Sequence, residues 1–239
     1  MRVDFCLPVK NEEKILKANT EKLVHFLQTN NLGIDWQVAI MVNGSNDDSY
    51  QIAQSLQSDR VKAKKLPLPG KGRALKACFR ESVADIIVFM DVDLAVSLEN
   101  IPKLLQPILN NNSDLVIGSR LLPDSNTERS FFRGLSSKIY NMMSRIILGH
   151  KFSDLQCGFK AINRQMFGRV ESFFQDDNWF FDTELVILMK KFQYRITEIP
   201  VDWKENRYDT RKSRVKILSD SWGFIVNLFL LKKRLKKIK

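Results

Sequence analysis

The sequence contains little cysteine and little histidine, which narrows the chemistry open to it. Its 239 residues include three cysteines, Cys6, Cys78 and Cys157, and two histidines. No two cysteines stand in a CxxC spacing, so we expect neither a structural zinc site nor a disulfide scaffold. Cysteine used this sparingly is typical of a reducing compartment. His25 and His150 lack a partner at the spacing of a catalytic triad, so we interpret both as surface or core residues.

Long hydrophobic runs are also absent. No apolar stretch reaches the roughly 18 residues needed to span a bilayer, and the longest one, 222–231, contains Asn227. The chain start meets Pro8 before the apolar core of a secretory signal could form. These absences predict a cytoplasmic protein that touches a membrane surface without crossing it.

Positive charge gathers at the C-terminal end of the chain. The formal net charge is +11, and residues 204–239 hold 12 basic and 3 acidic residues. Most of the excess therefore lies in this segment, and the remaining body is nearly neutral. Such a segment is attracted to an anionic surface, which could be a phospholipid leaflet, nucleic acid or an acidic protein.

Strand-like and helix-like segments alternate through the first half of the chain. Expected strands cover 3–7, 36–42, 61–66, 85–90 and 114–118, and expected helices cover 12–27, 50–56, 73–83 and 98–109. The segment 85–90 is wholly apolar after its first residue, which is typical of a strand buried on both faces. The rhythm predicts an α/β fold with a mainly parallel sheet flanked by helices.

Polar clusters follow four of these strands. They are Lys10 to Glu12, Asn43 to Asp47, Asp91 to Asp93, and Ser119 with Arg120. In open α/β sheets, ligands bind at the carboxyl ends of the strands. We therefore expect the four clusters to meet at one ligand-binding edge.

Asp91 and Asp93 are the candidate metal ligands. Two carboxylates one residue apart, at the end of a buried strand, can both reach a hard cation such as Mg²⁺ or Mn²⁺. The competing interpretation is that Asp93 caps the helix that follows. The position of the pair at the expected ligand edge favours the metal.

Two further polar segments have open interpretations. Residues 70–73, Gly-Lys-Gly-Arg, could offer backbone N–H groups to phosphate oxygens, or could be an ordinary loop. Asp182 and Glu184 could act as a general base or as substrate ligands, or could simply begin a helix.

The C-terminal residues 215–239 are expected to form one long helix, with Val215, Leu218, Trp222, Val226 and Phe229 on one stripe. Apolar bulk followed by six basic residues among the last eight favours an interfacial membrane helix. The alternative is a helix packed on the domain with a solvated basic end. Nucleic-acid binding is disfavoured because aromatic residues do not alternate with the cations.

An ordered set of short motifs resembles the family 2 glycosyltransferases of GT-A fold. The motifs are LPVKNEE, MVNGSND, PGKGRALKA, MDVDLA, VIGSR, SDLQCGFKAINR, WFFDTEL and EIPVDW. Within that family they look most like the dolichyl-phosphate mannose synthases and dolichyl-phosphate glucosyltransferases. The resemblance covers residues 3–214, so it implies a catalytic domain over 1–214 and a membrane-associating helix over 215–239.

The resemblance also implies roles for individual residues. Nucleotide and donor contacts are implied for Pro8, Asn11, Glu12, Asn43, Asp47 and Lys71. Metal and diphosphate binding is implied for Asp91 and Asp93, and proximity to the sugar for Asp182 and Glu184. Contact with phosphates or acceptor is implied for Arg120, Arg133 and Arg214.

The implied reaction moves a hexose from a nucleotide sugar to a polyprenyl phosphate, with inversion, at the cytoplasmic membrane face. UDP-glucose is the favoured donor. A GDP-mannose enzyme, a family 2 transferase with a non-lipid acceptor and a GT-A domain without turnover are the alternatives. A membrane-anchoring partner protein is an open option. The motif MVNGSND departs from the family, because Val42-Asn43 replaces its usual carboxylate pair, so the nucleotide is not fixed by this motif.

Overall fold

The computed structural model describes residues 1–128, 131–205 and 217–238, although the side chains of 131–133 and 217–222 lie outside the description. Within these residues, seven strands form one sheet in the order β3-β2-β1-β4-β7-β5-β8. Their bounds are β1 (Arg2–Val9), β2 (Asp35–Asn43), β3 (Val61–Leu66), β4 (Ile86–Met90), β5 (Leu115–Ser119), β7 (Phe159–Asn163) and β8 (Ile196–Pro200).

The sheet is mainly parallel, as the sequence predicts. β1 pairs in parallel with β2 and β4, β2 with β3, and β5 with β8. The exception is β7, which lies antiparallel between β4 and β5. The alternation of the sequence does not reveal β7, because its segment Phe-Lys-Ala-Ile-Asn has a lysine as the second residue of a buried strand.

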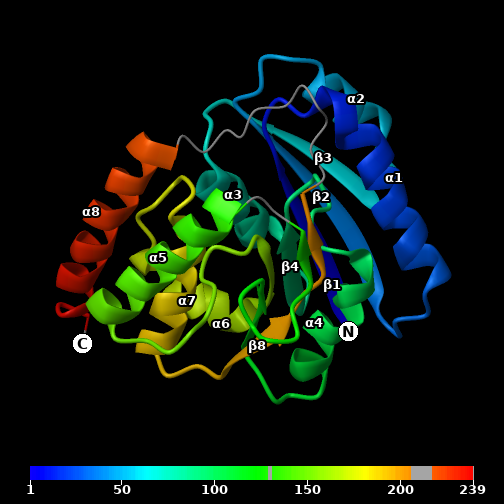
Figure 1. Cartoon of the computed structure of the whole chain (residues 1–239). Helices are drawn as coiled ribbons and strands as arrows, with labels where there is room; N and C mark the ends of the chain where they lie inside the picture. The colour runs from blue at the N-terminus through cyan, green and yellow to red at the C-terminus, as the bar shows by residue number, and fades with distance from the viewer. Residues whose placement is uncertain (129–130, 206–216, 239) are drawn as a thin grey trace.

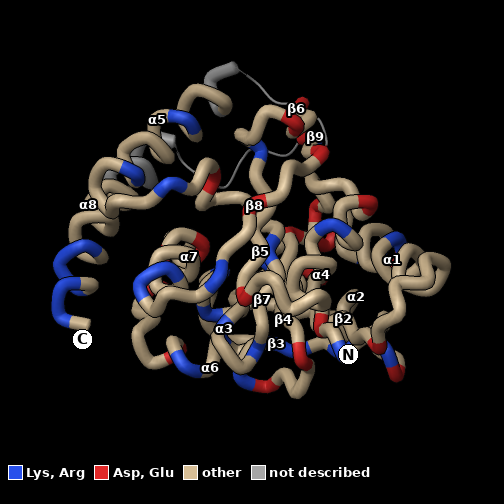
Figure 2. The backbone as a smooth tube through the Cα atoms, turned by 90° about the horizontal axis from the view of Figure 1, so that it is seen from below, with Lys and Arg blue, Asp and Glu red and all other residues tan. Residues whose placement is uncertain are grey.

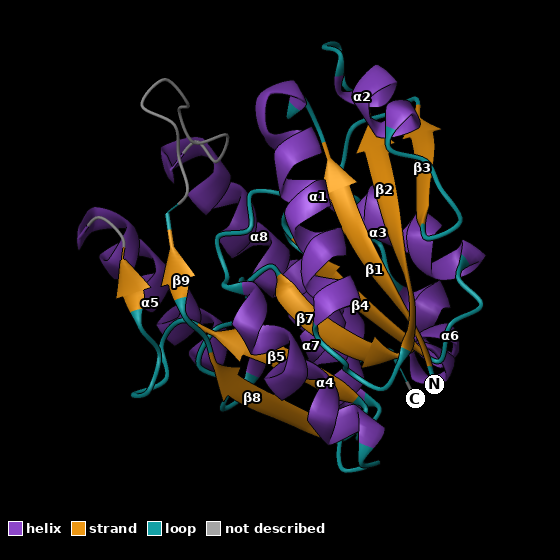
Figure 3. Ribbon diagram, turned by 90° about the vertical axis from the view of Figure 1, so that its right-hand side faces the viewer, coloured by secondary structure: helices purple, strands orange, loops and turns teal. Residues whose placement is uncertain are grey.

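Helices cover both faces of the sheet (Figure 1, Figure 3). One face packs on α1 (Glu13–Thr29), α2 (Ser49–Ser55) and α4 (Ile101–Leu109), the last preceded by a 3₁₀ turn at Leu98–Asn100. The other face packs on α3 (Lys71–Glu81), α6 (Arg164–Val170) and α7 (Phe181–Lys191), with a 3₁₀ turn at Glu171–Phe173. α5 (Phe131–Leu148) and α8 (Ile217–Leu235) lie outside this second layer. The two-residue strands β6 (Thr127–Glu128) and β9 (Trp203–Lys204) pair in parallel apart from the main sheet.

The alternation of side chains along the strands explains the two layers. In β4, Ile86, Val88 and Met90 join the core under α1 and α4, whereas Ile87 and Phe89 join the core under α3 and α7. Successive residues of a strand point to opposite faces, so a strand that is apolar throughout must be covered on both sides. Cys6, Cys78 and Cys157 are buried free thiols, as expected for a chain without a disulfide scaffold.

The C-terminal helix α8 exists as predicted, and one of its faces packs on the body. Leu228 and Leu231 are fully buried in the core shared with α7, and Phe224 packs against Tyr140 of α5 with 5.5 Å between ring centroids. Arg234 forms an ion pair with Glu184 of α7, whose side chain is 1% exposed. None of the described helices is long and apolar enough to cross a membrane.

This ion pair predicts a measurable contribution to stability. Changing Arg234→Met leaves Glu184 as a buried carboxylate without its cation, and we expect a loss of about 2 to 3 kcal/mol in the free energy of unfolding. The matched control Lys233→Met removes an exposed cation from the same helix turn and should cost less than about 0.5 kcal/mol. Urea unfolding of both variants measures the difference. Equal losses would show that the pair does not hold α8 to the body.

Candidate active site

The four polar clusters meet at one edge of the sheet, as predicted. β1, β2 and β4 run parallel, and β5 shares their direction because both β4 and β5 are antiparallel to β7. The carboxyl ends of these strands therefore lie on the same side. This edge also receives the start of α3 and of α7, which bring Lys71 and Asp182 to it.

Asp91 is the exposed carboxylate of this edge. Its side chain is 42% exposed, and one of its oxygens lies 2.9 Å from Lys71 Nζ. A Cβ added to Gly158 would stand 2.2 Å from the other oxygen, so the backbone of Gly158 passes directly against the carboxylate. A side chain at this position would displace the carboxylate, so Gly158 leaves room for Asp91 in the orientation that pairs it with Lys71.

Behind Asp91 lies a buried row of alternating charges. Lys71 Nζ is 3.0 Å from Asp182, and Asp182 is 2.6 Å from Lys160 Nζ. The three side chains are at most 5% exposed. Each buried charge therefore faces a charge of opposite sign, which compensates the loss of hydration.

The pKa values of this row follow from the contacts. Burial by itself would lower the pKa of Lys71, but Asp182 and Asp91 outweigh it and raise the pKa above its ordinary value. Burial would raise the pKa of Asp182, but Lys160 and Lys71 outweigh it and lower the pKa. Both groups are thus held in their charged forms. Asp182 is buried between two lysines, and its expected proximity to a sugar stays a prediction.

Asp93 lies within the turn that follows β4, which the N–H of Leu94 closes on the carbonyl of Asp91, and it is partly exposed. Its Oδ1 accepts the N–H of Ala95 at 3.2 Å, whereas the following 3₁₀ turn is capped by Ser97. The interpretation of Asp93 as the cap of the next helix is therefore wrong. Asp182 and Glu184 lie in the first turn of α7, so the expectation that they begin a helix is confirmed, although Phe180 rather than Asp182 holds the cap position.

The loop before α3 is locked to the rest of the protein by its backbone. Asn43 Oδ1 accepts the N–H of Gly70 at 2.9 Å, while the carbonyls of Asn178 and Asp177 accept the N–H groups of Gly72 and Arg73. These three N–H groups are satisfied internally, so they are not available to a phosphate, whereas contact of the Lys71 N–H with phosphate stays a prediction. Gly70 has φ of 141° and lies so close to Asp177 that a Cβ would meet its carbonyl oxygen at 2.3 Å. The result of this packing is a fixed position for Lys71.

The loops after β1 and β2 form a second part of the edge. Asn11, with φ of 51°, donates its N–H to Ser45 Oγ and accepts from the N–H of Asn46, both at 2.9 Å.

Two neighbouring residues also link these loops. Asp47 accepts from the N–H of Glu13 at 3.2 Å, and Glu12 donates its N–H to Ser49 Oγ at 2.8 Å. The fold thus brings Asn11, Glu12, Asn43 and Asp47 together near the end of β1, where Pro8 lies. Their contact with a nucleotide stays a prediction.

Arg120 is held by a buried partner. Its Nε and Nη2 atoms lie 2.6 and 3.0 Å from the oxygens of Asp154, which is fully buried. The guanidinium also lies 5.9 Å from the ring of Trp203. Arg120 holds the pKa of Asp154 below its ordinary value despite burial. The expected contact of Arg120 with phosphate or acceptor stays a prediction, and two of its three nitrogen atoms are already used by Asp154.

Glu184 does not join Asp182. Its carboxylate accepts the N–H groups of Gln175 and Asp176 and pairs with Arg234 of α8. Glu184 therefore holds the segment that packs on Gly70 and Gly72, one step removed from the site. The side chain of Arg133 and the whole of Arg214 lie outside the described residues.

The sequence did not identify two residues of the site. Lys160 is fully buried, and its ammonium bonds Asp182 and the carbonyl of Cys157. Trp179 is 42% exposed, with its ring centroid 5.5 Å from Lys71 Nζ. The sequence does contain a signal for Lys160, since it lies between Phe159 and Ala161 in an apolar segment. A lysine that is buried there requires a carboxylate partner.

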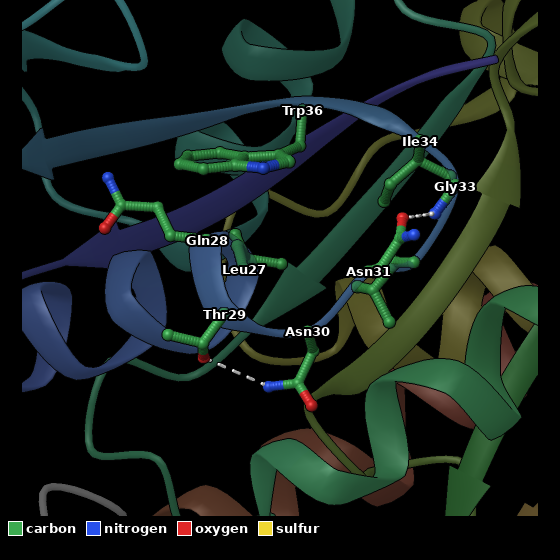
Figure 4. A pocket seen from close by; sticks show the side chains of 9 residues that line it. Leu27, Gln28, Thr29, Asn30, Asn31, Gly33, Ile34 and Trp36 are labelled. Carbon is green, nitrogen blue, oxygen red and sulfur yellow. Dashed lines mark hydrogen bonds between the residues drawn. The ribbon is translucent and has the colours of Figure 1, made fainter.

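A surface hollow of about 310 Å³ lies elsewhere, between the end of α1 and the start of β2 (Figure 4). Its lining runs from Leu27 to Ile34 and includes Trp36, and it contains no charged side chain. Because it lies at the amino end of β2, it is at the opposite edge of the sheet from Asp91. We assign it no part in the chemistry.

Asp91 and Asp93 suit a divalent cation. No group of three His, Cys, Asp or Glu side chains able to hold a metal is found in the described part of the chain. Mg²⁺ commonly binds through one or two carboxylates and takes its remaining ligands from water and substrate phosphates. An exposed carboxylate, fixed by Gly158 and Lys71 and followed by Asp93, fits this mode of binding.

The lowered pKa of Asp182 predicts a pH-dependent stability. Its folded pKa lies below the unfolded value of about 3.9, so its ionised form stabilises the fold fully above that value and the stabilisation is lost as pH falls through the folded pKa. The variant Asp182→Asn should lose about 3 kcal/mol near neutral pH, and the deficit should shrink below about pH 4. Urea unfolding across this range measures it, with Asp59→Asn as an exposed control. A deficit that stays constant into acid would refute the ionic role of Asp182.

Comparison with known proteins agrees with this geometry. The model of Glycosyl transferase family 2 matches residues 4–170. Glycosyltransferase AglD of Haloferax volcanii is 30% identical over 219 residues, which make up 90% of this chain and 35% of AglD. The dolichyl-phosphate beta-glucosyltransferase of Mus musculus is 28% identical over 85% of this chain and 68% of its own length. The dolichol-phosphate mannosyltransferase of Pyrococcus furiosus is 31% identical over 84% of this chain and 56% of its own length. The chain thus spans about a third of AglD and roughly two thirds or less of most curated relatives that it matches.

Solved structures show the same fold. Glucosyl-3-phosphoglycerate synthase from Mycobacterium tuberculosis, in complex with UDP, superposes with a TM-score of 0.72 at 20% identity, covering 97% of this chain and 80% of the synthase. Mannosyl-3-phosphoglycerate synthase from Rubrobacter xylanophilus gives a TM-score of 0.74 at 16% identity, covering 99% and 74%. The predicted GT-A architecture is therefore confirmed. Because the family model matches well over half of its length, the chain belongs to glycosyl transferase family 2.

Proposed function

We propose that the protein transfers a hexose from a nucleotide sugar to the phosphate of a polyprenol at the cytoplasmic face of a membrane, with UDP-glucose as the favoured donor. The observation that carries the proposal is the exposed Asp91, fixed by Lys71 and Gly158 beside Asp93 at the carboxyl edge of the sheet. This is the place where an α/β sheet presents ligands. The curated relatives support the acceptor, since those of Mus musculus and Pyrococcus furiosus are named for transfer to dolichyl phosphate.

Asp91 and Asp93 would hold Mg²⁺ or Mn²⁺, which when bound would neutralise the diphosphate of the donor. Solved structures of the same fold are described with Mn²⁺ or Mg²⁺ and UDP. Lys71 adds a cation that stays charged, because Asp182 and Asp91 raise its pKa. The protein's own part is to keep these charges in place before the donor arrives, so that little reorganisation is needed as negative charge develops on the leaving group.

The acceptor phosphate needs no strong base from the protein. A phosphate monoester has a second pKa of about 6, so it is largely dianionic at neutral pH. One phosphate oxygen would form the new bond to the anomeric carbon while the bond to the nucleoside diphosphate breaks, which inverts the configuration. The burial of Asp182 between two lysines agrees with this scheme, because no exposed base is required there.

A second acceptor class has its own support. The solved structures of this fold include a complex of glucosyl-3-phosphoglycerate synthase with phosphoglyceric acid, a non-lipid acceptor. Parallel assays with polyprenyl phosphate and with 3-phosphoglycerate distinguish the two. For the donor, a thermal-shift screen of UDP and GDP with Mn²⁺ separates UDP-glucose from GDP-mannose, since a ligand that binds the folded form raises the unfolding midpoint.

Loss of either aspartate should remove most of the transfer activity. We expect Asp91→Asn and Asp93→Asn each to lower the rate by a factor on the order of 10² to 10³, because electrostatic stabilisation of the leaving group is lost. The measurement is metal-dependent release of nucleoside diphosphate in the presence of polyprenyl phosphate. Asp124→Asn, which removes an exposed carboxylate, serves as the control. If both site variants kept near wild-type rates, the proposed mechanism would be wrong.

A further inference from the structure

α5 buries two polar side chains against the protein and exposes four large apolar ones. Its side facing the protein carries Asn141 and Ser144, both fully buried. Its side facing outward carries exposed apolar residues, between 45% and 74% exposed, namely Leu135, Ile139, Met142 and Ile146. Steps of four, three and four residues place these four on one stripe of the helix. A helix in contact with water normally has the opposite arrangement.

The buried polar side of α5 is satisfied by the active-site region. Asn141 Oδ1 accepts the N–H of Leu155 at 3.0 Å, next to Asp154. Tyr140 shares a hydrogen bond of 2.7 Å with Thr183 Oγ1, next to Asp182. The polar groups of the inner side bind the segments that build the site, while Ile147 and Leu148 of the same helix pack on the core. The exposed apolar stripe lies on the other side of this helix.

α8 also has an exposed apolar side. Its packed face contains Leu228 and Leu231, and the residues on the opposite side, Val226, Phe229 and Leu230, are between 40% and 57% exposed. Val226 and Phe229 belong to the stripe predicted from the sequence. A helix that is apolar on both sides needs an apolar environment on each of them. The two helices lie beside each other, on the side of the molecule away from α1 and α2 (Figure 1).

Cations border this apolar surface. Lys138 and Arg145 of α5 are exposed at one edge of its stripe, and Lys232 and Lys233 are exposed on α8. In Figure 2, basic residues mark α5 and gather at the C-terminal end of α8. Apolar side chains with cations at their margin suit a lipid surface with anionic head groups, because each Lys or Arg near it adds attraction and its aliphatic stem can remain in apolar contact.

We infer that the outer faces of α5 and α8 form one docking face for an anionic phospholipid membrane. This inference deepens the proposed function, because the face adjoins the site at which a lipid-borne phosphate would react. A soluble partner copy is a less suitable occupant, since two copies would bring the same basic margins together. The docking face thus places the site beside the head groups without any membrane-spanning segment among the described residues.

The test is co-sedimentation with vesicles of phosphatidylcholine alone and of phosphatidylcholine mixed with phosphatidylglycerol. The wild type should bind the mixed vesicles more tightly. Ile146→Glu should weaken this binding at least about tenfold, because it removes apolar burial and adds charge of the lipid's own sign. Val83→Glu is the matched control, since Val83 is 73% exposed against 74% for Ile146 but follows α3, away from both helices. Phe229→Glu tests α8 independently, should α5 tolerate its change poorly.

The outcomes are separable. Equal binding by Ile146→Glu and Val83→Glu, or no vesicle binding by the wild type, would overturn the docking face. A wild-type dimer that Ile146→Glu converts to a monomer, seen by sedimentation velocity without vesicle binding, would show a protein interface instead. Transfer to detergent-dispersed acceptor should be unchanged in Ile146→Glu, while transfer to vesicle-embedded acceptor should fall. If the wild type binds vesicles but transfers no sugar in either format, the proposed function fails and the docking face stands.

Discussion

The site depends on one buried lysine placed between two carboxylates. Lys71 is removed from water almost completely, and it remains charged because Asp91 and Asp182 lie within about 3 Å on either side. Lys160 completes the compensation from behind Asp182. The only member of this row with substantial exposure is Asp91. The row is buried at Lys160 and exposed at Asp91. The ion pair with Lys71 therefore holds the Asp91 carboxylate at the ligand edge before any ligand is present.

The topology of the sheet makes this row possible. β7 inserts antiparallel between β4 and β5, so the chain preceding it must pass over the carboxyl ends of its neighbours. That passage brings Gly158 against Asp91 and Asp154 against Arg120. Because β7 lies inside the sheet between β4 and β5, it also carries Lys160 into the core, where it meets Asp182. Without the reversed strand, the same edge would have the aspartates of β4 but neither the backbone that orients Asp91 nor the second lysine.

Local sequence was sufficient for β1 to β5 and for the edge at which the polar ends of four of them meet. Apolar runs that stop at Pro8, Asn43 and Asp91 define both, because parallel strands must place such ends together. The pairing of charges was not available from the same information. Lys71 and Asp182, or Glu184 and Arg234, are far apart in the chain, and their contact is decided by how α3, α7 and α8 pack. β7 was missed for a related reason, since a lysine in a buried strand is tolerated only when a distant carboxylate meets it.

The two sides of α5 connect the chemistry to the surroundings of the protein. Asn141 and Tyr140 face the segments that hold Asp154 and Asp182, so the helix cannot rotate to hide its outer stripe without breaking buried hydrogen bonds. The apolar stripe is consequently fixed outward by the same contacts that order the site. Exposure of this stripe to water is unfavourable in free energy, and contact with an apolar medium removes that penalty. The polarity of this one helix follows from having the active site on one side and, in our proposal, lipid on the other.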